Sequence, residues 1–548
     1  MKQIPIGIDD FKELIDDNYY YVDKTLLIKE VWSKKVSLYT RPRRFGKTLN
    51  MSMLYYFYAV QQKDNAYLFD GLEITKEIEI MEAQNQFPVI FLSLKDMKNY
   101  SFKNQLGNFK AIIREVVDKN IELLDSTYLN EFDKLKLRKY LAEDIDESEL
   151  QLSLRFISQC LYKHYHQKVI ILIDEYDVPL QNAYLRGYYN EMTDFLSNVF
   201  GSTLKSNDVL KTGILTGCLR IAKESIFTGM NNLNVYSILE EGCNQRFGFN
   251  QREIDALMKH YDVLAYRNDM KEWYDGYNFN GNGIYNPWST LMYMVKLIED
   301  NDKTPHPYWA NTSGNDIIYH YIQCGDTEMK HDFDILSAGG TIEKTIKSDL
   351  TYREMDDTGN IYSFLLFTGY LTVEEKIEWN RYRLTIPNKE IAYIYLEIFK
   401  EWFHNQMKEN RDDFANALLR EDVTQANKIL NRILFESISY FDYDEKFYHG
   451  ILIGMLSDLP ISSNQEAGLG RYDIAIVPNY IKEKVLLLEL KVTSVEEKKA
   501  ETAKLACQQI LNKKYIEGLR KKGYEDIVGY GIAFYKKSCL IVSLKDIL

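Results

Sequence analysis

Residues 35–49 read KVSLYTRPRRFGKTL, and the organisation of the chain can be worked out from this stretch. A strand-like run, residues 36–39, leads into a turn rich in arginine, and a helical pattern begins after Gly46, Lys47 and Thr48. Strand, loop and helix in this order are typical of a phosphate-binding loop. There the backbone N–H groups face a polyphosphate, Lys47 reaches the β- and γ-phosphates, and Thr48 offers a hydroxyl to Mg²⁺. The stretch therefore predicts a nucleoside triphosphate site.

One position of this stretch departs from the usual pattern G-x-x-x-x-G-K-[ST]. Arg41 stands where the first glycine belongs. We expect Arg43 and Arg44, in the same turn, to contact the nucleotide together with Gly46. The motif by itself leaves a second interpretation open, in which these residues form an ordinary basic loop in front of a helix.

A second stretch, KVIILIDEYD at residues 168–177, favours the nucleotide interpretation. Five consecutive aliphatic residues, 169–173, are typical of a strand buried on both faces of a parallel sheet. Asp174 then falls at the carboxyl end of that strand, where ligands of open α/β sheets bind. Asp174 would hold Mg²⁺ and Glu175 would polarise the attacking water, unless both are surface acids after a buried strand. The two stretches together indicate an ATPase with ATP and Mg²⁺ as cofactors.

A further strand is predicted at residues 209–216, VLKTGILT. We expect it between the two strands that carry the motifs, so that Thr216 at its end lies near the γ-phosphate. Arg220, four residues on, could sense that phosphate or act as an arginine finger, and an ordinary surface arginine is the alternative. The source of a finger stays open among Arg43, Arg44 and Arg220, and so does the formation of a homo-oligomer.

Composition limits the class of protein. The 548 residues carry a net charge of −13, which argues against general adhesion to nucleic acid but allows a local basic groove. The six cysteines include no C-x-x-C pair, so we expect reduced thiols and no zinc site. No run approaches the roughly 18 apolar residues of a membrane span, and the start of the chain lacks the apolar segment of a signal peptide. We therefore expect a cytoplasmic protein without membrane contact.

The chain divides by pattern into four regions. We expect an ATPase core over residues 1–240, a helical lid over 241–320, a mainly helical middle region over 321–430 and a separate domain over 431–548. The middle region also contains a hairpin-like segment at residues 361–385. Asn250 and Glu253 form a capping box that starts a lid helix. The aromatic turns at 273–277 and 285–289 belong either to a lid folded onto the nucleotide site or to a small core.

The last region carries chemistry of another class. Asp473 precedes a strand, and Glu489 and Lys491 lie two residues apart on the next strand, so that they share a face. Two carboxylates can hold Mg²⁺ against a phosphate while a lysine orients the attacking water, as in metal-dependent phosphodiesterases. Residues 482–537 contain 13 Lys/Arg against 8 Asp/Glu, which favours a polyanionic substrate. The alternative is an exposed, salt-bridged strand pair.

Three other acidic or imidazole side chains are weaker candidates for this site: Glu445, His449 and Glu466. Glu445 and His449 lie on one predicted helix, and a solvated helix face is the plainer interpretation of both. Glu466 lies in a loop whose glycines would allow close approach to a ligand.

Taken together, these motifs resemble those of bacterial predicted AAA-ATPase-like proteins that carry a C-terminal nuclease domain of the PD-(D/E)XK superfamily. The resemblance covers about residues 1–320 and 430–548. The motifs that carry it include Tyr21-Val22-Asp23-Lys24-Thr25, residues 41–48, residues 172–177, Thr216-Gly217, residues 273–277, residues 285–289, Tyr448-His449-Gly450, Glu489-Leu490-Lys491 and Gln508. Arg41 is a trait of that family, whereas Tyr472 replaces the proline of the superfamily name.

The resemblance implies an α/β fold class with two parts. The first is a P-loop NTPase of the ASCE/AAA-like type, a parallel sheet with a helical lid, and the second is a restriction-endonuclease-like α/β domain. It also implies that Gln508 positions the catalytic lysine or the substrate strand. The implied function is ATP-dependent or ATP-gated, Mg²⁺-dependent cleavage of nucleic acid, with DNA as the expected substrate, in defence or mobile-element control.

Two other functions stay open at this stage. One is a STAND-type switch, in which nucleotide exchange drives assembly and a sensed partner triggers the nuclease. The other is a nucleotide-dependent protein that binds DNA without cutting it. The intact trio of Asp473, Glu489 and Lys491 argues against the second, because each of these residue types has a role in phosphodiester hydrolysis.

Overall fold

The computed structural model describes residues 2–220, 227, 233–309, 327–356, 358–436, 445–456, 459–463, 465–467, 470–478 and 480–547. Two compact units make up the chain: a first unit of residues 1–314 and 341–393, and a second unit of residues 315–340 and 394–548. This division differs from the expected boundaries at 240, 320 and 430, because residues 341–393 pack with the N-terminal part of the chain. Within the described residues, no helix combines the length and apolarity needed to cross a membrane.

A five-stranded parallel sheet forms the centre of the first unit. Its strands, in spatial order, are β2 (Val89–Ser93), β3 (Val169–Asp174), β4 (Leu210–Gly217), β1 (Val36–Thr40) and β5 (Leu233–Tyr236). Every residue of β1 and β3 is buried, and for β3 the continuous apolar run of residues 169–173 predicts this burial. The prediction that β4 lies between the two motif-bearing strands is confirmed, so the phosphate-loop strand and the Asp174 strand end at the same edge.

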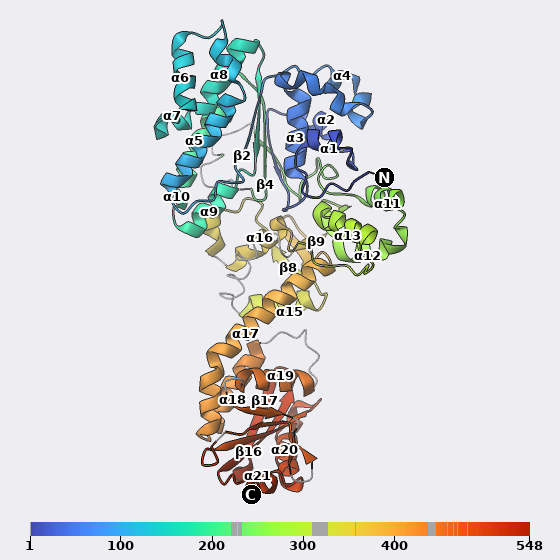
Figure 1. Ribbon diagram of the computed structural model, residues 1–548, viewed down its shortest axis with the longest axis vertical. Helices are drawn as coiled ribbons and strands as arrows, with labels where there is room; N and C mark the ends of the chain where they lie inside the picture. Colours follow the sequence, from blue (N-terminus) through green and yellow to red (C-terminus); the bar gives the residue numbers. More distant parts are fainter. Residues whose placement is uncertain are drawn as a thin grey trace. The chain divides into compact units, whose positions relative to one another are not determined.

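Helices cover both faces of this sheet (Figure 1). One face carries α1 (Phe11–Asp16), α2 (Leu27–Trp32), α3 (Lys47–Tyr58) and α4 (Ile78–Met81). The other carries α5 (Phe102–Asp118), α6 (Glu131–Leu141), α7 (Glu147–Gln151), α8 (Ser153–Tyr165) and α10 (Tyr189–Phe200). The short α9 (Val178–Arg186) follows the Asp174 strand. The result is the doubly covered α/β layer that parallel sheets require.

The expected lid is a small helical body with its own core. It contains α11 (Gln251–His260), α12 (Arg267–Tyr274), the hairpin of β6 (Tyr277–Phe279) and β7 (Asn282–Ile284), and α13 (Pro287–Glu299). Both halves of the predicted capping box are present, since the side chain of Asn250 accepts from the Glu253 N–H and that of Glu253 accepts from the Asn250 N–H. Tyr274 and Tyr285 are buried in the lid core. The aromatic turns therefore build this core.

Residues 341–393 contain a three-stranded sheet in the region expected to be mainly helical, and two of its strands form a hairpin within the expected hairpin-like segment 361–385. Its antiparallel strands lie in the order β8 (Ile342–Thr345), β10 (Arg381–Thr385) and β9 (Thr372–Lys376). Threonine, valine and tyrosine in these runs favour strands over helix. The intervening α16 (Ile361–Thr368) is buried on all sides. Helices follow in α17 (Lys389–Leu419) and α18 (Val423–Glu436), and α15 (Thr327–Ser337) precedes the sheet.

Glu390, in the first turn of α17, links this segment to the end of the described lid. Its side chain is fully buried, and its Oε1 accepts a hydrogen bond from the Trp309 N–H at 2.9 Å. Burial raises the pKa of Glu390 to about 7, above its ordinary value of 4.5. The folded first unit therefore holds this carboxyl protonated at a pH where the unfolded chain ionises it.

Replacing Glu390 with glutamine is expected to remove a pH dependence of stability. Because the folded pKa is raised, wild-type stability is highest below the unfolded pKa and falls as the pH rises from about 4.5 to about 7. Between about pH 5 and about pH 8 the Glu390→Gln variant should lose about 1–2 kcal/mol less stability in urea unfolding than the wild type, because it lacks the contribution of this one carboxyl. The exposed carboxylate of Glu378 offers a control, Glu378→Gln, which should behave like the wild type. Equal losses in wild type and Glu390→Gln would contradict this expectation.

The second unit is built on a mixed five-stranded sheet. Its strands, in spatial order, are β11 (Ile461–Ser463), β14 (Ile474–Ile476), β15 (Val485–Val492), β16 (Ile527–Tyr535) and β17 (Ser538–Ser543). Within the described strands of this sheet, only β15 and β16 pair in parallel. The chain crosses between these two strands through α20 (Lys499–Asn512) and α21 (Tyr515–Arg520), as a parallel pair requires.

Successive residues of β16 point to opposite faces of this sheet, and their contacts identify the helices that cover each face. Gly531 faces α20, and a Cβ there would collide with the carbonyl oxygen of Ala503, so the glycine allows the helix to approach closely. On the opposite face Tyr530 donates a hydrogen bond to the Leu418 carbonyl of α17. Phe534, on that same face, stacks on Tyr448 of α19 (Glu445–Leu456). This helix–sheet–helix arrangement agrees with the α/β domain expected at the C-terminus.

Candidate functional sites

The loop between β1 and α3 has the backbone of a phosphate-binding loop. Gly46 adopts a left-handed conformation with φ +76°, and α3 begins at the next residue. Lys47 is buried, and its Nζ lies 3.2 Å from the carbonyl oxygens of both Arg41 and Pro42. The same ammonium lies 3.4 Å from Glu175 Oε1. Burial opposes its charge, yet the Cys218 sulfur and the nearby carboxylates raise the pKa of Lys47 overall, so the side chain stays a cation.

A buried carboxylate lies next to this lysine. Asp174 Oδ2 accepts a hydrogen bond from Thr48 Oγ1 at 2.8 Å, and Oδ1 accepts one from the Thr216 hydroxyl. Burial, and then the charge of Glu175, raise the pKa of Asp174, and a cation bound beside it would favour the charged form. A hydroxyl and a carboxylate in contact at this edge of a parallel sheet are suitable ligands for the Mg²⁺ of a nucleotide.

Of the residues after Asp174, Glu175 has an unusual backbone conformation and Asp177 holds the chain that leaves β4. Glu175 has φ +53°, a conformation that few residues other than glycine adopt and that is often found at functional sites. Asp177 Oδ2 accepts hydrogen bonds from the N–H groups of Cys218 and Leu219, both at 2.9 Å. Burial and the charge of Glu175 raise the pKa of Asp177 to about 6. Sequence reasoning did not single out Asp177, although the D-x-x-D spacing was visible.

Other parts of the first unit pack against the phosphate-binding loop. Gly369, at the end of α16 with φ +93°, lies so close to Pro42 that a Cβ would come within 2.9 Å of the proline ring. Phe45 packs on the β6 rings of Tyr277 at 5.0 Å and Phe279 at 5.2 Å. The loop is therefore held between the lid and residues 341–393.

The second unit brings its three predicted residues together. The register pairs Ile474 with Leu488, so Asp473, one step earlier, stands opposite Glu489. Asp473 Oδ2 accepts a hydrogen bond from the Leu490 N–H at 2.8 Å. Lys491, two residues beyond Glu489 on the same face of β15, donates a hydrogen bond to Gln509 Oε1 at 2.7 Å.

The carboxylates of this cluster are suited to a cation. Glu489 is 1% exposed, and its Oε2 has no hydrogen-bond partner in the described part of the chain. Burial, and then the charge of Asp473, raise the pKa of Glu489 to about 8. Burial also raises the pKa of Asp473. A buried carboxylate oxygen without a partner, facing a second carboxylate, is stabilised by a divalent metal ion.

Comparisons with known proteins agree with the two expected domains. Residues 5–227 match a family model described as "Predicted AAA-ATPase", and residues 443–544 match the model of the PD-(D/E)XK nuclease superfamily. The chain combines an AAA-ATPase-like domain with a PD-(D/E)XK nuclease-like domain. A protein of Azotobacter chroococcum mcd 1, described as an uncharacterized protein in the vnfD 5' region, is 25% identical over 562 residues, which span 99% of this chain and 98% of that protein.

The predicted arginines of the AAA-ATPase-like domain have separate surroundings. Arg43 is half-buried, and its Nη2 donates a hydrogen bond to Gln181 Oε1 of α9 at 2.8 Å. The Arg44 guanidinium lies over the ring of Trp288 in α13, 4.4 Å from its centroid. Arg220 follows β4, and its Nε is buried without a hydrogen-bond partner among the described residues. Its neighbours, 221–226, lie outside those residues, so its proposed role at the γ-phosphate stays a prediction.

The glutamine that contacts Lys491 and Glu489 is Gln509, and not Gln508 as the resemblance implied. Gln509 bridges the site, since its Nε2 donates to Glu489 and its Oε1 accepts from Lys491, whereas Gln508 is exposed. The reason is the phase of α20, which buries Ala506 and Ile510. A helix turns about 100° per residue, so only one of two adjacent glutamines can face the strand.

This assignment predicts different effects for the two glutamines. Gln509→Ala should lower the rate of nucleic-acid cleavage about 10- to 100-fold, because Lys491 loses the partner that holds it beside Glu489. Gln508→Ala is the matched control on the same helix and should cleave like the wild type. Single-turnover cleavage with Mg²⁺ measures both rates. A larger loss in Gln508→Ala than in Gln509→Ala would contradict the placement.

The weaker candidates for the metal site of this domain lie in different surroundings. His449, on α19, has its Nε2 3.2 Å from the Asp473 carbonyl oxygen and therefore borders the site. Glu466, on β12 (Glu466–Ala467), forms an exposed ion pair with Arg471 on β13 (Gly470–Arg471) at 3.4 Å. The side chain of Glu445 lies outside the described part.

Proposed function

We propose that the chain is an ATP-gated, Mg²⁺-dependent nuclease that cuts nucleic acid, with DNA as the expected substrate, in the bacterial cytoplasm. The setting that the resemblance implies is defence or mobile-element control. The observation that carries the proposal is the contact of Gln509 with both Glu489 and Lys491, opposite Asp473, where a carboxylate oxygen is buried without a partner among the described residues.

In the nuclease-like domain Asp473 and Glu489 would hold Mg²⁺, which lowers the pKa of a bound water and stabilises charge on the phosphate. Lys491 lies beside them in an orientation fixed by Gln509. From there its ammonium can orient the attacking water and offset the negative charge that develops on the phosphate. These roles require the three residue types that the domain presents on one face.

In the AAA-ATPase-like domain Thr48 and Asp174 would hold the Mg²⁺ of ATP. The hydrogen bond from Thr216 keeps Asp174 oriented toward Thr48. Lys47 lies near Glu175, and a phosphate bound to the loop would compete for this ammonium. Glu175 would then be free to polarise the attacking water.

Gating is supported by the contacts of the phosphate-binding loop. Pro42 packs against Gly369, so a movement of the loop on nucleotide binding would press on residues 341–393. The chain continues from this segment directly into α17, and the longer part of the second unit begins at Ile394 within that helix. We propose this segment as the connection through which the nucleotide state reaches the nuclease.

The test is cleavage of labelled DNA and RNA by the full chain with Mg²⁺, with and without ATP. Lys491→Ala should abolish cutting, and Lys47→Ala should abolish or deregulate it, because it removes the phosphate-binding cation. The exposed Lys482 provides a control, Lys482→Ala, in which cutting should persist. If ATP is hydrolysed and no substrate is cut under any condition, the nuclease proposal fails in favour of a triggered switch or a DNA-binding protein.

A further inference from the structure

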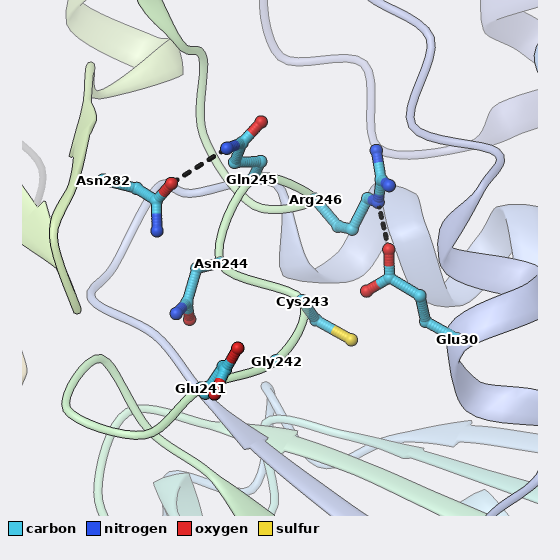
Figure 2. Close-up of a pocket in the computed structure, with 8 residues that line it drawn as sticks. All are labelled: Glu30, Glu241, Gly242, Cys243, Asn244, Gln245, Arg246 and Asn282. Carbon is cyan, nitrogen blue, oxygen red and sulfur yellow. Dashed lines mark hydrogen bonds and ion pairs between the residues drawn. The ribbon is translucent and has the colours of Figure 1, made fainter.

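A groove lies beside the phosphate-binding loop, at the carboxyl end of β5. β5 is the parallel neighbour of β1, so both strands end at the same edge of the sheet. The chain that leaves β5 forms one wall, residues 241–246, and Glu30 of α2 and Asn282 of β7 complete a groove of about 290 Å³ (Figure 2). An adjoining cavity of about 580 Å³ shares Glu30, Glu241 and Arg246 and adds the apolar surfaces of Leu26 and Tyr236. Ligands of open α/β sheets bind at such an edge.

Arg41 joins this groove to the phosphate-binding loop. Its Nη2 donates to the Gly242 carbonyl at 3.3 Å and to Asn244 Oδ1 at 3.0 Å, and its Nη1 donates to the Tyr236 carbonyl at 2.6 Å. The guanidinium is fully buried and lies 5.1 Å from the Phe247 ring. Arg41, which stands where the usual pattern has glycine, thus links the groove wall to the phosphate-binding loop through its own side chain.

A second attachment lies on the other side of the loop. Asn50, in the first turn of α3, donates a hydrogen bond from Nδ2 to the Arg246 carbonyl at 2.9 Å. Lys24 donates to the Gln245 carbonyl, also at 2.9 Å. The wall of the groove is therefore held from both ends of the phosphate-binding loop. A ligand in the groove would have a fixed position relative to phosphates bound at that loop.

The chemistry of the lining favours an uncharged, hydrogen-bonding ligand. Arg246 is paired with Glu30 at 2.6 Å, and Glu241 adds a second carboxylate, so the groove disfavours a phosphate. The Gln245 Nε2 donates to Asn282 Oδ1 at 2.8 Å, which places two amide side chains next to each other. Side-chain amides match the donor and acceptor edge of a nucleobase, and a carboxylate can accept hydrogen bonds from ribose hydroxyls.

We propose that this groove binds the base and ribose of the nucleotide whose phosphates lie at Lys47. The proposal rests on the proposed ATPase function and assigns the nucleoside part of its ligand. It places Gln245 and Asn282 at the base and Glu241 at the ribose.

The test is calorimetric titration of the full chain with the Mg²⁺ complexes of ATP, 2'-deoxy-ATP and inorganic tripolyphosphate. Gln245 is exposed, so Gln245→Trp should fold, fill the groove and weaken ATP binding at least about tenfold while leaving tripolyphosphate within about twofold. Glu241→Ala should lower the preference for ATP over 2'-deoxy-ATP at least about threefold. The exposed Gln86 supplies a control, Gln86→Trp, with wild-type affinities expected.

The outcomes separate this inference from the function on which it rests. If Gln245→Trp and Glu241→Ala both bind all three ligands like the wild type, the groove assignment is overturned while the phosphate site stands. If Lys47→Ala binds ATP as tightly as the wild type, or the wild type binds no nucleotide, the ATPase proposal itself fails. Melting temperatures of the variants show whether each is folded, and Glu241→Ala decides the question if Gln245→Trp is not.

Discussion

Replacing Glu489 with glutamine is expected to abolish nucleic-acid cleavage and, at the same time, to stabilise the metal-free second unit. Cleavage should fall at least about 100-fold, because the amide cannot replace a carboxylate as a ligand of Mg²⁺. Stability should rise because burial and the charge of Asp473 raise the pKa of Glu489 to about 8. Ionising this side chain in the folded protein therefore costs free energy that the neutral amide avoids.

The sign of the pH effect follows from that pKa. Below the ordinary value of 4.5 the carboxyl is protonated in both states, and the loss of stability grows as the pH rises from there to about 8. In EDTA at about pH 8, Glu489→Gln should be more stable than the wild type by about 2 kcal/mol in urea unfolding. Added Mg²⁺ should stabilise the wild type and leave the variant unchanged.

An exposed carboxylate of the same unit provides the control for Glu489. Glu501→Gln should retain both the cleavage rate and the response to Mg²⁺. A Glu489→Gln variant that is less stable than the wild type in EDTA would mean that the carboxylate is already compensated within the protein, and the argument for a metal site would lose its main support.

Restoring the usual glycine at position 41 is expected to damage the ATPase domain. Arg41→Gly should lower the free energy of unfolding of the first unit by about 3 kcal/mol, because the carbonyls of Tyr236 and Gly242 and the Asn244 side chain lose a buried donor. Nucleotide affinity should fall at least about tenfold, since the loop is no longer held to the chain after β5. Urea unfolding and calorimetric titration with MgATP measure the two effects.

A matched control lies in the same loop. Arg44 has φ +69°, a conformation that glycine adopts without strain, and its guanidinium lies over Trp288 at a half-exposed site. Arg44→Gly should therefore change the free energy of unfolding by no more than about 1 kcal/mol. If Arg41→Gly is as stable as Arg44→Gly, Arg41 is not the structural link that its hydrogen bonds suggest.

The parallel sheet and its chemistry could be predicted because both follow from local pattern. A continuous apolar run identifies β3, the strand-like run before the glycine loop identifies β1, and the carboxyl ends of parallel strands meet at one edge. The approach of Thr216 to Asp174 is therefore a consequence of strand order, which the sequence motifs indicate. The pairing of Asp473 with Glu489 follows in the same way from two adjacent strands.

What could not be predicted depends on contacts between distant segments or on helix phase. Nothing in the sequence near Arg41 indicates that its partners are Tyr236 and Asn244, about 200 residues away. The choice between Gln508 and Gln509 needs the rotation of α20 about its axis, which two adjacent identical residues do not reveal. In the sheet of residues 341–385, the hairpin of β9 and β10 could be predicted from local pattern, whereas the pairing of β8 with β10 joins segments that are distant in the sequence.

The five side chains of residues 41–45 each contact a different part of the first unit: the chain after β5, the end of α16, α9, α13 and β6. Four of these five contacts lie beyond residue 227, where the match to the AAA-ATPase family model ends. Removing everything after that residue would leave a phosphate-binding loop whose neighbours are missing. A shortened protein that keeps these contacts therefore needs the whole first unit, residues 1–314 and 341–393, and not only the residues up to 227.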